Sequence, residues 1–351
     1  MTNLSAFSAV PRSLSLTPYS LLPILYSPIP VSRLPSPISR SLRSPPNARN
    51  LELSHNRQGF VPISARRPIK VVFHPSDFTE GSEVAFAHAL KIALIARAEL
   101  DILHVSEKDK EGWTEFPGVR QMLERWRVLP PNSPKNAVAA IGLGVRKVVM
   151  KGKDPIHAAQ HFLEENPTDF VVLAAHTQNG RMRWGRGKVL SQPIASASDA
   201  AALFVPYGSE GFVSRADGNP SLKNVLIPVD SSPSPGAAIE AAQRLTWALQ
   251  CPEVTFTLLH VGKTGEMPSV KTEEQDGWTW RKLTRDGEVV DTILSTAKEV
   301  SADLIVMTTA GRDGFLDGLR GSTTERVLRG GMIPVLAIPA AMAIRGGAVV
   351  I

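Results

Sequence analysis

Glycine and hydroxyl residues near the end of the chain have the types and the spacing that can bind a phosphate group. Gly311 lets the backbone approach a ligand closely, because glycine has no Cβ atom. Gly321 precedes Ser322 and Thr323, and Glu325 follows Ser322 by three residues, which is the spacing of a capping box at a helix start. The free N–H groups and hydroxyls of such a helix start bind anions. The residues alone leave two interpretations open: a phosphate loop, or a glycine turn before a capped helix.

The elements before this loop must place it at one end of a sheet. In open parallel α/β sheets, ligands bind beyond the carboxyl ends of the strands. Asp230 ends the first strand of this half and Val261 ends the second, so we expect both to meet the 308–323 loop in one crevice. The alternating patterns that predict these elements are strand "NVLIPVDSS" (224–232), helix "PGAAIEAAQRLTWAL" (235–249) and strand "VTFTLLHV" (254–261).

The first half of the chain repeats the same pattern. Both halves have Pro-x-Asp at the end of the first strand, at Pro75–Asp77 and Pro228–Asp230, and both end the second strand in Leu-His-Val. Eighteen positions separate Asp169 from Gly187 and also Asp303 from Gly321, so no gap interrupts this correspondence. A duplication is the simplest account.

Strands that alternate with helices predict right-handed βαβ crossovers and a parallel sheet. We therefore expect two doubly wound, Rossmann-like α/β domains in tandem. The predicted division is a leader over 1–67, a first domain over 68–210, a linker over 211–221, a second domain over 222–340 and a tail over 341–351. Two Trp-bearing segments, 111–126 and 266–283, are expected to be amphipathic covers that bury their tryptophans.

The basic residues of the chain are concentrated in the leader. Of 39 Lys and Arg residues and 33 Asp and Glu residues, residues 1–67 contain eight and one respectively, so the other 284 residues have a net charge of −1. A body without basic excess argues against nucleic-acid binding. The leader has ten prolines, which predicts disorder, and its Ser- and Arg-rich composition also resembles an organellar transit peptide. A mis-assigned translation start is the third interpretation that the composition leaves open. We expect a cytoplasmic protein without a membrane segment, with an organellar location as the alternative.

Catalytic signatures are missing from the sequence. His104, His157, His161 and His260 are the obvious bases, and none falls in a recognisable triad. A single histidine at a strand end is more often a hydrogen-bonded core residue than a catalytic one. H-E-x-x-H, C-x-x-C and G-x-S-x-G are all absent. The residues therefore predict a binding protein with at most slow hydrolysis.

The spacing around the loop resembles the nucleotide loop of the universal stress protein family. That motif is Gly-x2-Gly, nine residues, then Gly-Ser/Thr. Here Thr308 to Gly311, nine residues (312–320), and Gly321–Ser322 fit it, except that Thr308 stands in place of the first glycine. Further segments resemble the family in the same order: "NVLIPVD", "LLHV", "SADLIVM" and "GSTTERVLRGGMIPVLAIP", and in the first half "VVFHPSDFTEGSEVAFAHAL", "DILHV" and "DFVVLAA". The resemblance covers 69–340 and is to a tandem universal stress protein.

This resemblance implies a nucleotide site in the second domain, for ATP or AMP, with or without Mg²⁺. The family positions carried over are an acidic residue near adenine and ribose, an adenine-side residue and the phosphate loop; they fall on Asp230, Val261, Gly311, Gly321, Ser322 and Thr323. The family's dimers, paired through the final strand, imply an internal pseudo-dimer of "ALFVP" (202–206) against "VLAIP" (335–339). A further homodimer stays open.

The first domain departs further from the motif. Ala174 to Thr177, nine residues, and then Gly187–Lys188 stand in its place, so both early glycines are lost and Lys188 replaces the hydroxyl residue. Asp77 and Gly187 are retained, and phosphate binding by charge alone remains conceivable through Lys188, Arg181, Arg183 and Arg186. We expect this domain to be degenerate and mainly structural or regulatory.

Three functions follow in order of support. The first is an adenine-nucleotide-binding stress-response module, whose ligand state changes its shape or its partners. The second is a nucleotide-free scaffold or chaperone-like interaction protein, in which 308–323 is only a capped turn. An enzyme that transfers AMP or phosphate has the least support, because no base or metal set is visible.

Overall fold

The computed structural model describes residues 68–106, 116–178, 181–184, 188–189, 200–263, 265–309 and 322–340. The predicted leader and tail lie outside these residues. The first repeat has, in chain order, strand β1 (Val71–Pro75), helix α1 (Glu80–Ala96), β2 (Glu99–Ser106), α2 (Val119–Arg125), α3 (Ala137–Ala140), β3 (Gly144–Lys151), α4 (Pro155–Glu165), β4 (Phe170–Gln178), β5 (Arg181–Trp184), β6 (Lys188–Val189) and β7 (Ala201–Pro206).

The second repeat has the same order of main elements, without α2, α3, β5 and β6 and with a helix, α7, before its last strand. Its elements are β8 (Asn224–Pro228), α5 (Gly236–Ala248), β9 (Val254–Val261), β10 (Trp278–Arg285), α6 (Val289–Glu299), β11 (Leu304–Thr309), α7 (Thr323–Gly330) and β12 (Val335–Pro339). The chain is therefore a doubly wound α/β structure built from two copies of one unit, as the sequence predicts.

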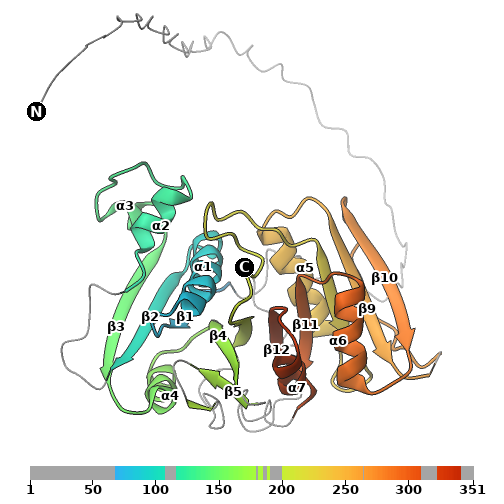
Figure 1. The fold of residues 1–351 in the computed structure, drawn as a ribbon. Helices are drawn as coiled ribbons and strands as arrows, with labels where there is room; N and C mark the ends of the chain where they lie inside the picture. The colour runs from blue at the N-terminus through green and yellow to red at the C-terminus, as the bar shows by residue number, and fades with distance from the viewer. Residues whose placement is uncertain are drawn as a thin grey trace, which may run out of the picture. The chain divides into compact units, whose positions relative to one another are not determined.

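One continuous sheet runs through both repeats (Figure 1), in the order β10-β9-β8-β11-β12-β7-β4-β1-β2-β3. Within each repeat the neighbouring strands of this order are parallel. The second repeat is built outward from β8 to β9 and β10 and then returns to β11 on the other side of β8. The strand order thus reverses between β8 and β11, which is where ligands bind in folds of this kind.

The two repeats are joined by an antiparallel pair of strands. Phe204, Leu203 and Ala202 of β7 pair with Val335, Leu336 and Ala337 of β12, and all six side chains are buried. These are the segments "ALFVP" and "VLAIP", which the sequence predicts to pair within one chain.

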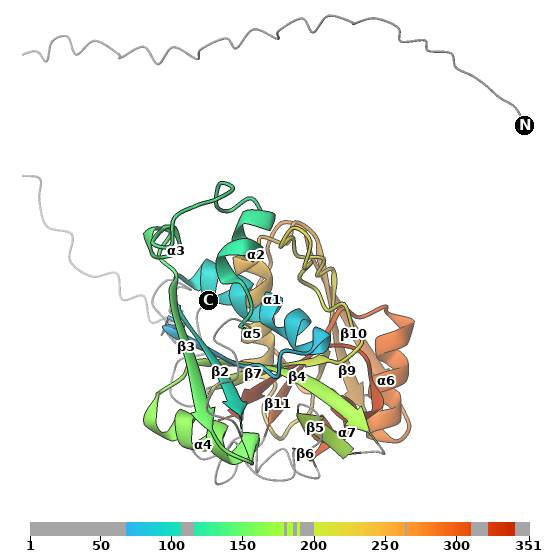
Figure 2. The ribbon, with the colours of Figure 1, turned by 60° about the vertical axis from the view of Figure 1, so that its left-hand side comes forward.

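Alternating residues of each strand pack into two cores, one on each face of the sheet. Phe256 and Leu258 face the core beneath α1 and α5, whereas Leu259 faces the core beneath α4, α6 and α7. Figures 1 and 2 show these two groups of helices on opposite faces of the sheet. Both cores contain residues from both repeats, so the hydrophobic packing is continuous across the junction.

An aspartate at the equivalent position holds the first strand of each repeat. A carboxylate oxygen of Asp169 accepts hydrogen bonds from the N–H groups of Lys70 and Val71, at 2.8 and 3.1 Å. Asp303 accepts from Lys223 and Asn224 in the same way, at 2.8 and 2.9 Å. Asp169 and Asp303 are also the residues from which the eighteen-residue spacing is counted. The spacing therefore begins at two positions that have the same structural role in their repeats.

One prediction about an irregular segment needs correction, and one small extension of the sheet was not predicted. The stretch after β4 in the first repeat forms a small antiparallel extension, because β5 pairs with β4 and β6 pairs with β5. The period-two pattern of "RMRW" is compatible with this strand. In the second repeat, residues 278–283 are not a cover but belong to β10, a strand at the edge of the sheet. The ring of Trp280 there stacks on Phe256, with centroids 4.4 Å apart.

A buried histidine holds the segment between the repeats. Nε2 of His88, on α1, accepts hydrogen bonds from the N–H groups of Phe212 and Val213, at 3.0 and 3.2 Å. Its Nδ1 lies 2.8 Å from the carbonyl oxygen of Val84, so that nitrogen carries the proton. Burial lowers the pKa of His88 to about 4, and burial does the same for His74. Both rings are therefore neutral when the protein is folded at neutral pH.

These two histidines predict acid sensitivity between about pH 6.5 and pH 4. Their pKa values are lower in the folded chain than the ordinary 6.5, so the unfolded chain binds more protons in this range. Stability is complete above pH 6.5 and falls as the pH drops, by about 3 kcal/mol for each histidine at pH 4. In urea unfolding, His88→Leu should be less stable at pH 7 by about 1–3 kcal/mol, because two buried N–H groups lose their acceptor. It should also lose less stability on acidification than the unchanged chain.

His157→Gln is the matched control, because His157 is exposed on α4. Its pH dependence should equal that of the unchanged chain. A His88→Leu variant with the full acid sensitivity would contradict this assignment.

Candidate functional site

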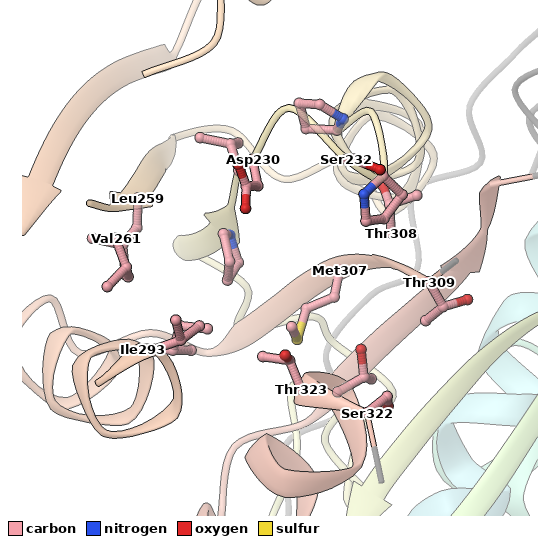
Figure 3. A pocket seen from close by; sticks show the side chains of 16 residues that line it. Asp230, Ser232, Leu259, Val261, Ile293, Met307, Thr308, Thr309, Ser322 and Thr323 are labelled. Atoms are coloured by element: carbon pink, nitrogen blue, oxygen red, sulfur yellow. The ribbon is translucent and has the colours of Figure 1, made fainter. Parts of the chain in front are cut away.

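A pocket lies at the carboxyl ends of the strands of the second repeat, at the reversal of strand order. Its volume is about 220 Å³ (Figure 3). The polar lining residues are Asp230, Ser232, Thr308, Thr309, Ser322, Thr323 and Thr324. The apolar lining residues are Pro228, Val229, Pro233, Pro235, Leu259, Val261, Val289, Ile293 and Met307.

Four of the six predicted site residues line this one pocket. Asp230 follows β8, Val261 ends β9, and Ser322 and Thr323 stand at the start of α7. Figure 3 shows Asp230 on the side of the pocket opposite Ser322 and Thr323. The other two predicted residues, Gly311 and Gly321, lie outside the described residues.

The two aspartates that follow the first strands have different surroundings. Oδ1 of Asp230 accepts the N–H and the hydroxyl of the next residue, Ser231, at 2.6 and 3.3 Å, and the side chain remains exposed at the pocket. Oδ1 of Asp77 likewise accepts the N–H and the hydroxyl of one residue, Thr79, at 3.1 and 2.6 Å, but Thr79 is the N-cap of α1. Asp77 therefore supports a helix start, whereas Asp230 presents a carboxylate to a cavity.

The start of α7 has the geometry that the capping-box spacing predicts. Ser322 has extended backbone angles, and its hydroxyl accepts the N–H of Glu325 at 3.2 Å. Ser322, Thr323 and Thr324 of this helix start line the pocket, and the free N–H groups of a first helical turn carry a positive partial charge. An anion is stabilised at such a helix start.

The wall beside α7 comes from α6, which sequence reasoning missed. Val289 and Ile293 of α6 line the pocket, and Val289 is partly exposed at its rim. Glu288 caps α6 by accepting the N–H groups of Val290 and Asp291, and it also pairs with Arg326 of α7 at 2.6 Å. The sequence signal for the cap was Glu288, a glutamate directly before a helical pattern. Its pairing with Arg326, 38 residues later, has no local signal in the sequence.

The strand-end histidines are structural, as the sequence predicts. Nδ1 of His260 lies 3.1 Å from the carbonyl oxygen of Val229, and Nδ1 of His104 lies 2.8 Å from that of Ser76. Each ring thus connects the second strand of its repeat to the residue after the first strand. His157 and His161 lie on α4, where His161 pairs with Glu165 at 3.5 Å, and neither lines the pocket of the second repeat.

Metal clusters and membrane-spanning helices are both absent from the described part of the chain. Over those residues, there is no cluster of three or more His, Cys, Asp or Glu side chains that could hold a metal ion by themselves. Within the same residues, every helix is too short or too polar to cross a membrane.

The first repeat does not present the predicted loop chemistry in the same form. The segment at the place of its phosphate loop contains the β5 and β6 strands, and Lys188 pairs in register with Trp184. Gly187 and Arg186 lie outside the described residues. The nucleotide-loop positions of the two repeats have diverged in sequence, and in the first repeat part of this stretch forms strands.

The family of the chain follows from comparison with known proteins. The universal stress protein family model matches residues 68–199 and 272–339, which is more than half of the chain. The chain belongs to the universal stress protein family. The two matched regions fall in the two repeats, so this is a tandem universal stress protein.

Solved structures with similarity to this universal stress protein include members of the same family. A universal stress protein from Archaeoglobus fulgidus is 18% identical, with 77% of this chain and 98% of that chain covered and a TM-score of 0.48. A Pseudomonas aeruginosa protein of unknown function is 13% identical, with 77% and 92% covered and a TM-score of 0.47. A universal stress protein in complex with cAMP is 20% identical, with 30% and 76% covered and a TM-score of 0.19. A search of curated proteins found no match.

Thr308, where the family motif has glycine, gives a stability prediction. Its hydroxyl oxygen is buried and has no hydrogen-bond partner among the described residues. Thr308→Val keeps the shape and removes the unpaired hydroxyl, so it should raise the free energy of unfolding of the ligand-free protein by about 1 kcal/mol. The neighbouring Thr309→Val is the control, because the Thr309 hydroxyl donates to the carbonyl oxygen of Ile338 at 3.4 Å and its loss should destabilise. Urea unfolding measures both; destabilisation by Thr308→Val would show that its hydroxyl is paired.

Proposed function

We propose that this universal stress protein binds one adenine nucleotide, ATP or AMP, in the pocket of the second repeat. The observation that supports the proposal most is the convergence of Asp230, Val261, Ser322 and Thr323, which are distant in sequence, on a single cavity. The cavity lies at the reversal of strand order, the usual ligand position in doubly wound sheets.

The chemistry of the lining fits the parts of a nucleotide. Leu259, Val261 and the proline residues provide an apolar wall for a base. The carboxylate of Asp230 is an acceptor suited to ribose hydroxyls. Ser322, Thr323 and the start of α7 provide the donors that phosphate oxygens need. Mg²⁺ is commonly bound by one or two carboxylates together with phosphate oxygens, and Asp230 is the one carboxylate of the described lining.

A regulatory role suits this pocket better than a catalytic one. The described lining contains one ionisable side chain, Asp230, and no histidine, lysine or arginine that would serve as a base or an acid. We therefore propose a binding module in a stress response, with the first repeat as a structural partner that completes the sheet and both cores.

Calorimetric titration of the purified chain with ATP and AMP tests the proposal, together with mass analysis of any small molecules released from it. We expect one nucleotide bound per chain. Asp230→Ala should weaken binding about 10- to 100-fold, because a hydrogen bond to a charged group contributes about 1.5–3 kcal/mol. The matched control is Asp77→Ala in the first repeat, which should lower stability through the loss of its Thr79 bonds and leave the affinity unchanged.

Two results would contradict the proposal. Absence of binding by the unchanged chain at millimolar nucleotide would remove the function. Equal weakening by Asp77→Ala and Asp230→Ala would move the site away from this pocket.

A further inference from the structure

An ion pair joins two residues that stand next to the pocket lining in sequence. Nη2 of Arg326 lies 2.6 Å from Oε1 of Glu288. Glu288 directly precedes Val289, and Arg326 follows Thr323 by three residues, so each partner is next to a residue that lines the pocket. Residues three apart lie on the same side of a helix. The guanidinium group is thus held between the first turns of α6 and α7.

The two partners are not equally fixed. The other carboxylate oxygen of Glu288, Oε2, accepts the N–H groups of Val290 and Asp291, at 2.8 and 3.1 Å, so Glu288 cannot leave without uncapping α6. Among the described residues, the Arg326 side chain makes its hydrogen bond to Glu288 alone, and about half of the side chain is exposed. Arg326 is therefore the partner that can move.

The charges around the pocket favour movement of Arg326 toward an anionic ligand. Asp230 carries the one formal charge of the described lining, and that charge is negative. Glu288 adds a second negative charge at the rim, and the bond from Arg326 lowers its pKa, which keeps it ionised. An anionic ligand beside Ser322 and Thr323 is repelled by both carboxylates and attracted by Arg326, which lies at the same end.

We propose that Arg326 exchanges partners when an anionic nucleotide binds, leaving Glu288 and turning to the phosphate. The inference rests on the proposed function, and it adds a phosphate-sensing residue that is not part of the glycine loop. The exchange breaks the direct link between α6 and α7, so phosphate binding is coupled to the spacing of these two helices. Phosphate charge, rather than the adenine base, is then the signal that reaches the surface of the second repeat.

The experiment measures affinities for adenosine, AMP and ATP by calorimetry with two opposing variants. Glu288→Gln keeps a carbonyl oxygen that can cap α6 but releases Arg326 and removes a repelling charge, so it should tighten AMP and ATP binding roughly three- to tenfold. Arg326→Gln should weaken both by a similar factor. Adenosine, which has no phosphate, should bind equally to all forms. The effects should be larger for ATP than for AMP and should shrink at high salt.

The chain offers a control for each variant. Glu299→Gln removes a carboxylate at the other end of α6, where Glu299 pairs with Arg285 at 3.1 Å. Arg329→Gln removes an arginine one turn further along α7, where it pairs with Glu325. Neither control should change any of the three affinities. Arg326→Lys keeps the charge and should retain most of the AMP and ATP affinity if Arg326→Gln loses it.

The outcomes separate the inference from the proposed function. If both Glu288→Gln and Arg326→Gln weaken all three ligands alike, the pair is a structural clamp and the exchange is wrong. If neither differs from its control while the unchanged chain binds nucleotide, the proposed function stands and the exchange is again overturned. If the unchanged chain binds neither nucleotide, both fail together.

Discussion

The antiparallel pairing of β7 with β12 is the interaction on which the rest of the structure depends. Each repeat ends in a short strand of buried aliphatic and aromatic side chains, and such a strand cannot remain at an exposed sheet edge without inviting association. Two copies of such an edge can pair with each other when they run antiparallel. A two-fold axis gives the same arrangement, because it brings the same surface of two subunits together. The duplicated chain makes this pairing internally, and both cores then extend through it. The remaining edges are β3 and β10, which carry charged residues such as Lys147 and Lys282.

This junction also determines where a ligand site can be built. Because β7 and β12 run in opposite directions, the carboxyl ends of the strands that flank the junction point to opposite ends of the sheet. The described lining of the pocket of the second repeat comes from residues 228–324 alone. The β5–β6 extension of the first repeat contributes no described residue to that lining, although β5 lies against α7.

Features that depend on the spacing of neighbouring residues were predicted well from the sequence. Asp230, Val261 and Ser322 could be expected to meet in one crevice because each stands at a strand end or a helix start, whose signals lie within a few residues. The contacts that escaped prediction join distant positions: His88 to Phe212 and Val213 across about 125 residues, and Glu288 to Arg326 across 38. Nothing in the residues beside His88 marks its ring as the acceptor for a distant backbone. The β10 edge strand escaped for another reason, because its mixture of tryptophans and charged residues fits a half-buried strand and an amphipathic cover equally well.

The two repeats separate the residues that maintain the fold from those that make a site. Asp169 and Asp303 accept hydrogen bonds from equivalent backbone groups. His104 and His260 connect equivalent strands, so these positions have the same structural role in both repeats. Asp77 and Asp230 also share a position, and Oδ1 of each accepts the N–H and the hydroxyl of one nearby residue, Thr79 or Ser231. Thr79 is the N-cap of α1, so Asp77 supports the start of that helix, whereas Asp230 is exposed and lines the pocket. Equivalent positions of the two repeats can therefore lie in different surroundings while the sheet, both cores and the junction are shared.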